Sequence, residues 1–200
     1  MRTRPRLSFR AAWVLVAAPA LACAPDLRDD HPFDGQVNSG PLVSVEAQGD
    51  GVLLATVDAS NKGSQVFMDL DSGTEMKAEE AFSTNGWDLA FKRFEISMNG
   101  GAGNPTGIVR VAVVGDAFES LTRAPADGYL QDGADAVFAS VEGGWYLYDL
   151  GAHKLVAREG LVYVVQTSQK ASLKLQMRGY YGDDGTPAII RFLYAPLLAP

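Results

Sequence analysis

Residues that could bind a metal through nitrogen or sulfur are few in this sequence. The chain has two histidines, His31 and His153, and a single cysteine, Cys23. His31 lies in a polar segment, where a fixed ligand geometry is not expected. His153 follows an aromatic run and precedes another apolar stretch, so it lies at or near a turn. It is a candidate metal ligand, and the alternative is a turn histidine whose ring forms local hydrogen bonds.

Oxygen-rich and glycine-rich segments also suggest chemistry, and each has a simpler interpretation. Residues 69–75 carry oxygen-bearing side chains at alternate positions, as a calcium-binding loop does. The other positions that a calcium loop requires are missing, so we predict a hairpin turn. Residues 99–107 contain four glycines, but no helix and no Lys-Ser or Lys-Thr pair follows, so we predict a flexible loop and not a phosphate loop. Several thiolates or imidazoles would be needed for a zinc site, and they are lacking.

The sequence offers little for covalent catalysis. It has no Gly-x-Ser-x-Gly motif, and a lipidated Cys23 would leave no thiol for chemistry. The carboxyl groups of Asp183 and Asp184 are neighbours in a predicted turn, where they need not converge on one substrate atom. We therefore expect a binding protein and not an enzyme.

The N-terminus has the parts of a signal peptide. Four arginines within residues 1–10 precede the apolar run 11–18, which is too short to span a bilayer. Leu21-Ala22-Cys23 resembles a bacterial lipobox, so we predict that residues 1–22 are removed and that Cys23 is lipidated. The alternative is ordinary cleavage after Ala20-Leu21-Ala22, which would give a secreted protein with a free thiol.

Charge excludes one class of partner. Removal of residues 1–22 takes away four of 17 basic residues and none of 24 acidic ones, so the mature chain carries 13 basic residues and a net charge of −11. Nucleic acid is not an expected partner, because phosphate binding needs a basic surface. Attachment to a membrane is expected through the lipid on Cys23 only.

Residues 23–41 are polar, aperiodic and punctuated by Pro and Gly, so we predict a flexible tether. Residues 42–200 then alternate short apolar runs with turn residues, which predicts an all-β fold with antiparallel sheets. A short helix is expected at Met76–Phe82, and the Gly/Asp clusters at residues 48–51 and 182–185 predict tight hairpins. The expected strands are Leu42–Ala47, Val52–Val57, Gln65–Leu70, Trp87–Phe91, Phe94–Met98, Ile108–Val114, Ala136–Ala139, Trp145–Tyr148, Leu161–Thr167, Ser172–Met177 and Ala188–Tyr194.

Two of these strands carry aromatic and β-branched residues at consecutive positions. They are Trp145–Tyr148 and the run 162–167. Such a pattern indicates either a strand covered on both faces or a wide aromatic surface. In the second case Tyr146 and Tyr148 would be ligand-binding candidates, and in the first they would belong to a core of two packed sheets.

The ordered motifs of residues 50–195 resemble the HmuY family of bacterial surface lipoproteins. The resemblance rests on Val57–Ser60, Phe67–Gly73, Asn85–Phe91, the Gly-rich loop, Gly143–Asp149, His153–Leu155, Leu161–Thr167, Leu173–Gln176 and Tyr180–Tyr181. The best-known members are haemophores, so the resemblance implies an all-β domain that holds haem between projecting loops. It also implies an outer-membrane or cell-surface location and a possible outer-membrane receptor as a partner.

In the best-known haemophore two histidines bind the haem iron. The resemblance places one of these positions near Leu150 and the other between Tyr129 and Ala136, and this chain has no histidine at either place. His153 matches a histidine that many relatives carry directly before a Lys-Leu pair, which is Lys154-Leu155 in this chain. The expected function is binding of haem or another planar apolar ligand. The alternative is an envelope lipoprotein with a structural or protein-interaction role that does not bind haem.

Overall fold

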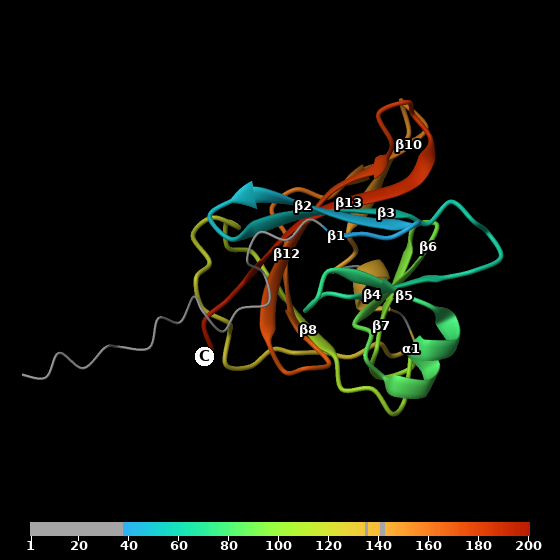
Figure 1. Cartoon of the computed structure of the whole chain (residues 1–200). Helices are drawn as coiled ribbons and strands as arrows, with labels where there is room; N and C mark the ends of the chain where they lie inside the picture. The colour runs from blue at the N-terminus through green and yellow to red at the C-terminus, as the bar shows by residue number, and fades with distance from the viewer. Residues whose placement is uncertain (1–37, 135, 141–142) are drawn as a thin grey trace, which may run out of the picture. The chain divides into compact units, whose positions relative to one another are not determined.

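The computed structural model describes residues 38–134, 136–140 and 143–200 (Figure 1). The predicted signal peptide, Cys23, His31 and most of the predicted tether lie outside these residues, so their processing and lipidation remain predictions. The end of the predicted tether is paired, because β1 (Asn38–Ser39) lies beside β2 in an antiparallel ladder.

The larger sheet has seven strands in the order β1-β2-β3-β13-β12-β11-β8, and every neighbouring pair is antiparallel. The fold class predicted from the sequence is therefore confirmed. The last strand of the chain lies in the middle of this sheet, between β3 and β12 (Figure 1). The strands that follow β1 are β2 (Val43–Gly49), β3 (Val52–Asp58), β8 (Arg110–Val114), β11 (Val162–Gln166), β12 (Ser172–Tyr181) and β13 (Pro187–Pro196).

A second sheet has four strands in the order β5-β4-β6-β7, and a separate hairpin joins β9 to β10. Within the described ranges, two short helices, α1 and η1, complete the fold. The bounds are β4 (Val66–Asp69), β5 (Thr74–Met76), α1 (Ala78–Thr84), β6 (Leu89–Lys92), β7 (Glu95–Met98), η1 (Val137–Ala139), β9 (Tyr146–Asp149) and β10 (Lys154–Ala157).

The two larger sheets share one hydrophobic core. Alternate residues of β3 are buried, as expected for a strand with one face on the core. Phe91 of β6 stacks on Phe192 of β13 with ring centroids 5.8 Å apart, which joins the four-stranded sheet to the seven-stranded one. In β11 the residues from Val162 to Val165 are all buried, so the consecutive apolar residues there mark a strand covered on both faces.

Most predicted strands and both predicted tight hairpins are present, and two expectations are wrong. Ala136–Ala139 forms no strand: residues 137–139 make a 3-10 turn, and the Val137 amide donates to Oδ1 of Asp132 at 2.9 Å. The helix begins at Ala78 and not at Met76, because Met76 pairs with Phe67 as the last residue of β5. The strand β10 was not expected.

The Gly-rich segment 99–107 is a loop, as expected, and packing and hydrogen bonds hold it in place. Gly101 has φ +62, and a Cβ atom there would collide with the backbone oxygen of Asp132. The side-chain amide nitrogen Nδ2 of Asn104 donates to the side-chain oxygens of Asn85 at 2.5 Å and Asn99 at 2.7 Å. The glycines therefore allow close backbone contact with Asp132.

Candidate functional site

The β9–β10 hairpin carries three of the residues singled out from the sequence. In its register Tyr146 faces Ala157, Leu147 faces Val156, and Tyr148 faces Leu155. Oδ1 of Asp149 accepts hydrogen bonds from the amides of residues 151 and 152 at 2.7 and 3.0 Å, which closes the turn. His153 ends the turn with φ 51, in the left-handed region.

The hairpin rests on the domain through aromatic contacts at its base. The Tyr146 ring packs on Phe94 and Trp145, at centroid distances of 5.5 and 5.2 Å. The hydroxyl of Tyr181 in β12 accepts a hydrogen bond from the Leu155 amide at 3.2 Å. β10 and the outer end of β12 therefore lie side by side, and together they form the projection at the top of Figure 1.

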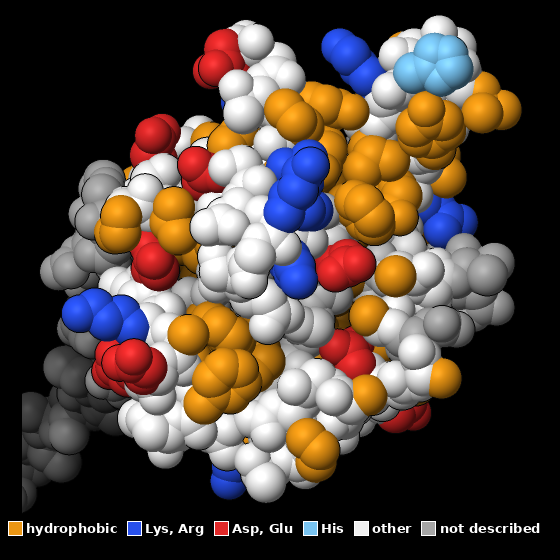
Figure 2. Space-filling view, turned by 90° about the vertical axis from the view of Figure 1, so that its right-hand side faces the viewer, with side chains coloured by type: hydrophobic (Ala, Val, Ile, Leu, Met, Phe, Trp, Pro, Cys, Tyr) orange, Lys and Arg blue, Asp and Glu red, His pale blue; other side chains and the backbone are white. Residues whose placement is uncertain are grey.

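Beyond its base the hairpin presents apolar side chains to solvent. Leu147 and Val156 face each other across the ladder and are 58% and 49% exposed, and Leu150 at the turn is 78% exposed. Tyr148, on the other face of the ladder, is also exposed. Figure 2 shows the result as a pale blue histidine at the tip of the projection, with hydrophobic side chains gathered below it. Exposed apolar side chains that gather in this way mark an interaction surface.

One ring nitrogen of His153 forms a hydrogen bond, and the other forms none with the described residues. The hydroxyl of Tyr148 lies 3.2 Å from Nδ1 of His153. No hydrogen bond involves Nε2 among the residues that the structure describes, and the side chain is exposed. A histidine whose Nδ1 is held by a neighbour is oriented to bind a metal through Nε2.

The structure thus brings together some of the predicted site residues and separates others. Tyr148 contacts His153, but Tyr146 packs on Phe94 and Trp145 at the base and lies away from the imidazole. Sequence reasoning missed Leu147, Leu150 and Val156 as surface residues. The apolar run 155–157 was the available signal, but three residues next to a turn are too few to be recognised as a strand.

Among the described residues, the hairpin offers a haem one axial ligand, the imidazole of His153. Nε2 of His153 is one strong ligand for iron, and the porphyrin faces are apolar like the exposed side chains of the hairpin. The four methionines in the described part of the chain do not supply a second ligand, because Met68, Met98 and Met177 are buried in the core and Met76 packs against the buried side chains around Trp87.

A groove of about 660 Å³ lies over the outer face of the seven-stranded sheet, away from the hairpin residues. Its polar lining includes Lys174, whose ammonium group donates to the backbone oxygens of Phe118 and Leu121 at 2.5 and 2.8 Å. Burial lowers the pKa of this lysine, and Glu119 partly offsets the shift. The ammonium group therefore holds the 118–121 segment on the sheet, which is a structural task.

Among the described residues no helix combines the length and the apolar character needed to cross a membrane. The search of curated proteins gives no match to this sequence. The family model described as HmuY protein matches residues 61–149, a range that runs from before β4 to the end of β9.

Solved structures with the same fold come from Bacteroides and Tannerella. An apo HmuY analog of Tannerella forsythia has a TM-score of 0.54 at 15% identity, over 74% of this chain and 97% of that one. A candidate HmuY-like heme-binding protein of Bacteroides vulgatus has a TM-score of 0.53 at 13% identity, over 77% and 96%. A candidate lipoprotein of Bacteroides fragilis has a TM-score of 0.55 at 14% identity, over 78% and 95%.

At such identities the structures establish a shared fold. The family model adds a match in sequence, and it covers the β4–β5 hairpin, the Gly-rich segment and the strand β9 that leads to His153. Residues 61–149 of this chain therefore match the HmuY family model, and the β domain has the fold of HmuY-like proteins.

Proposed function

We propose that this protein binds haem, or another planar apolar ligand, at the projecting β9–β10 hairpin. The observation that carries the proposal is the pairing of an oriented imidazole with exposed apolar side chains on one small element. His153 is held through Nδ1 by Tyr148, whose ring is exposed, and Leu150 in the same turn is 78% exposed. The match of residues 61–149 to the HmuY family model, and the fold shared with a candidate HmuY-like heme-binding protein, support haem as the first ligand to test.

In this proposal Nε2 of His153 binds the iron and the apolar hairpin covers part of the porphyrin. The two histidine positions of the best-known haemophore are not matched, since residue 150 is leucine and no histidine lies between Tyr129 and Ala136. We therefore expect a complex with one protein ligand, weaker than a bis-histidine complex and high-spin. The protein would act as a binding module, with no catalytic step.

Titration of haem into the purified protein, followed at the Soret band, tests this function. The wild-type protein should shift the band in a saturable way, and His153→Ala should lose most of the shift. His31→Ala is the matched control, because it removes the other histidine, and it should behave as wild type. A full Soret shift in His153→Ala would rule out ligation by His153, and no shift in wild type would contradict haem binding.

A second function has support from the same surface. Leu150 stands at the tip of the hairpin and is 78% exposed, where the resemblance places a haem ligand in the best-known haemophore. An apolar tip without that ligand suits contact with another protein of the cell envelope. Under this alternative, Leu150→Asn would abolish capture of that partner, and haem would leave the Soret band unchanged.

We also propose that lipid on Cys23 anchors the protein to the outer membrane or the cell surface. Cys23 directly follows an apolar run and Ala22, and Ala24 at the second mature position favours sorting to the outer membrane. The candidate lipoprotein of Bacteroides fragilis shares the fold. Mass spectrometry of membrane-bound protein should find diacylglycerol on Cys23. A soluble product with unmodified Cys23 would show secretion instead.

A further inference from the structure

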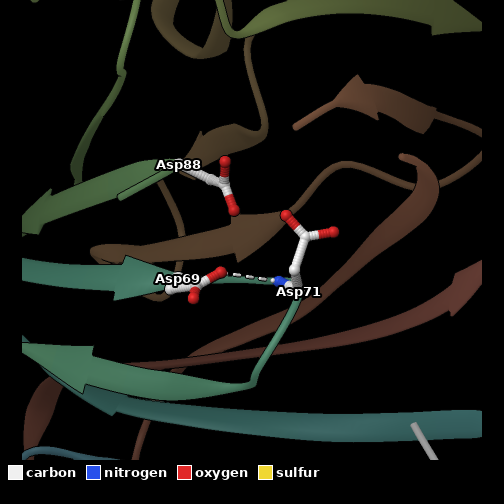
Figure 3. A group of neighbouring side chains, drawn as sticks. All are labelled: Asp69, Asp71 and Asp88. Atoms are coloured by element: carbon white, nitrogen blue, oxygen red, sulfur yellow. Dashed lines mark hydrogen bonds between the residues drawn. The ribbon is translucent and has the colours of Figure 1, made fainter. Parts of the chain in front are cut away.

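Three aspartates from two segments of the chain meet beside the core. Asp69 ends β4, Asp71 lies in the following turn, and Asp88 directly precedes β6. One carboxylate oxygen from each lies within 4.8 Å of the others. Pairing of β4 with β6 brings them together, because Met68 faces Leu89 in the register. Figure 3 shows the carboxyl groups of Asp71 and Asp88 turned toward each other.

Asp69 and Asp88 are already held by hydrogen bonds. Oδ2 of Asp88 accepts from the Leu70 amide at 2.8 Å, and Oδ1 accepts from the Ser168 amide at 2.6 Å. Oδ1 of Asp69 accepts from the Asp71 amide at 2.9 Å. Both carboxyl groups are therefore fixed in place, with lone pairs left over, as preorganised ligands must be.

Asp71 has an oxygen with no such partner. Its side chain is 2% exposed, and Oδ2 is buried without a hydrogen bond to any described residue. Asp88 beside it is 0% exposed. The charged groups that act on these two carboxyl groups are other aspartates, with no lysine or arginine among them. A buried charge with no counter-charge costs several kcal/mol, so such carboxylates are typically paired or bound to a metal.

We propose that Asp69, Asp71 and Asp88 bind one calcium ion. The ligands are all oxygens, which selects a hard cation over zinc or copper. Calcium binds oxygens at about 2.3 to 2.6 Å, so two ligands on opposite sides lie about 4.6 to 5.2 Å apart, and the present spacing of up to 4.8 Å suits it without movement. Magnesium, at about 2.1 Å, brings opposite ligands to about 4.2 Å and demands a closer cluster.

Further ligands are at hand. Oγ of Ser168 is buried and has no hydrogen-bond partner among the described residues, and its own amide donates to Asp88. Asp69 is half-buried, so water can reach the ion from its side and complete the coordination. This ligand set differs from the calcium-loop pattern considered for residues 69–75. Asp88 supplies the ligand that a later position of such a loop would supply. Glu75 is not a ligand here, because its carboxylate accepts a hydrogen bond from the Leu42 amide.

The ion would join the two sheets. Asp69 and Asp88 belong to the four-stranded sheet and its edge, whereas Ser168 lies in the turn between β11 and β12 of the seven-stranded sheet. Calcium should therefore raise the thermal stability of the whole domain. This inference is independent of haem binding.

Calorimetric titration and thermal melting of the full-length protein, freed of divalent metal with EGTA, test the site. Calcium at 5 mM should raise the melting temperature by about 5 °C, and magnesium at the same concentration should raise it far less. Asp71→Asn should lose most of the calcium-induced shift. Asp127→Asn is the matched control at an exposed aspartate, and it should keep the full shift.

Terbium luminescence on the wild-type protein, with calcium as competitor, gives a second measurement that does not depend on folding of a variant. Saturable terbium binding that calcium displaces supports the site. No binding of either ion to wild type, or calcium binding of unchanged affinity in Asp71→Asn, overturns it. Equal shifts with magnesium and calcium would overturn the choice of calcium.

Discussion

The hydroxyl of Tyr148 lies 3.2 Å from Nδ1 of His153 across the β9–β10 turn. Both side chains are exposed, so the contact contributes little to the stability of the domain. Its effect is on orientation, because a ring held at Nδ1 presents only Nε2 to a metal.

Tyr148→Phe removes this contact and keeps the aromatic ring. We expect the free energy of unfolding to change by less than about 0.5 kcal/mol. Haem affinity should fall up to about tenfold, since the imidazole is no longer held for ligation. Tyr146→Phe is the matched control, because Tyr146 packs at the base of the hairpin, and its haem affinity should be that of wild type. Equal affinities of both variants would show that the hydroxyl does not orient the ligand.

Trp145 and Trp87 are both 1% exposed but differ in their indole nitrogens. Nε1 of Trp145 donates to the backbone oxygen of Phe94 at 2.9 Å, whereas Nε1 of Trp87 has no hydrogen-bond partner among the described residues. Trp145→Phe should therefore destabilise the domain by about 1 to 2 kcal/mol more than Trp87→Phe. Either change to Ala should cost about 3 to 5 kcal/mol. Urea unfolding measures these differences, and equal losses in the two Phe variants would contradict the role of the hydrogen bond.

Substitutions at Gly101 and Gly128 separate two costs of adding a Cβ atom, which are a collision with neighbouring atoms and backbone strain at positive φ. Both have positive φ, but a Cβ at Gly101 would collide with Asp132, whereas the space around Gly128 is open. Gly128→Ala should cost about 1 kcal/mol through backbone strain alone. Gly101→Ala should cost more than about 3 kcal/mol, because the backbone of the Gly-rich segment must move away from Asp132. Similar melting temperatures for the two variants would exclude a tight contact there.

In calcium-free buffer the stability of the domain should fall as the pH rises. Burial raises the pKa of Asp71 from 3.8 to about 6 and that of Asp88 from 3.8 to about 7. Between about pH 4 and pH 7 the folded state therefore holds more protons than the unfolded state, and the free energy of unfolding decreases with pH. The total loss should be on the order of 7 kcal/mol, because each pKa unit corresponds to about 1.4 kcal/mol. Asp71→Asn should flatten the profile, and a wild-type profile that rises through this range would contradict the assignment.

Much of the fold could be predicted because the apolar pattern is regular where strands are long. Val52–Val57 and Ser172–Met177 alternate or run apolar between clear turn signals, and both are strands. Ala136–Ala139 was misread because its apolar residues form a 3-10 turn, and the Val137 amide donates to Oδ1 of Asp132, five residues earlier. The apolar pattern alone does not show that hydrogen bond.

The sites were harder to predict than the strands. His153 and Tyr148 are close in sequence, and the turn between them could be anticipated. The aspartate cluster could not, because Asp88 reaches Asp71 only through the pairing of β4 with β6, and nothing in the sequence fixes that register. The buried state of Asp71 likewise depends on the sheets that cover it.

The position of β13 sets the order in which the domain can form. β3 ends at Asp58 and pairs with a strand that begins at Pro187, so most of the domain's length separates two neighbours in the sheet. Closing a loop of this length costs entropy before any contact offsets it, and folds rich in such contacts form slowly. Until residues 187–196 leave the ribosome, β3 and β12 lack the strand that joins them. The nascent chain therefore stays open, which is the state in which a chain with the predicted signal peptide would have to cross a membrane.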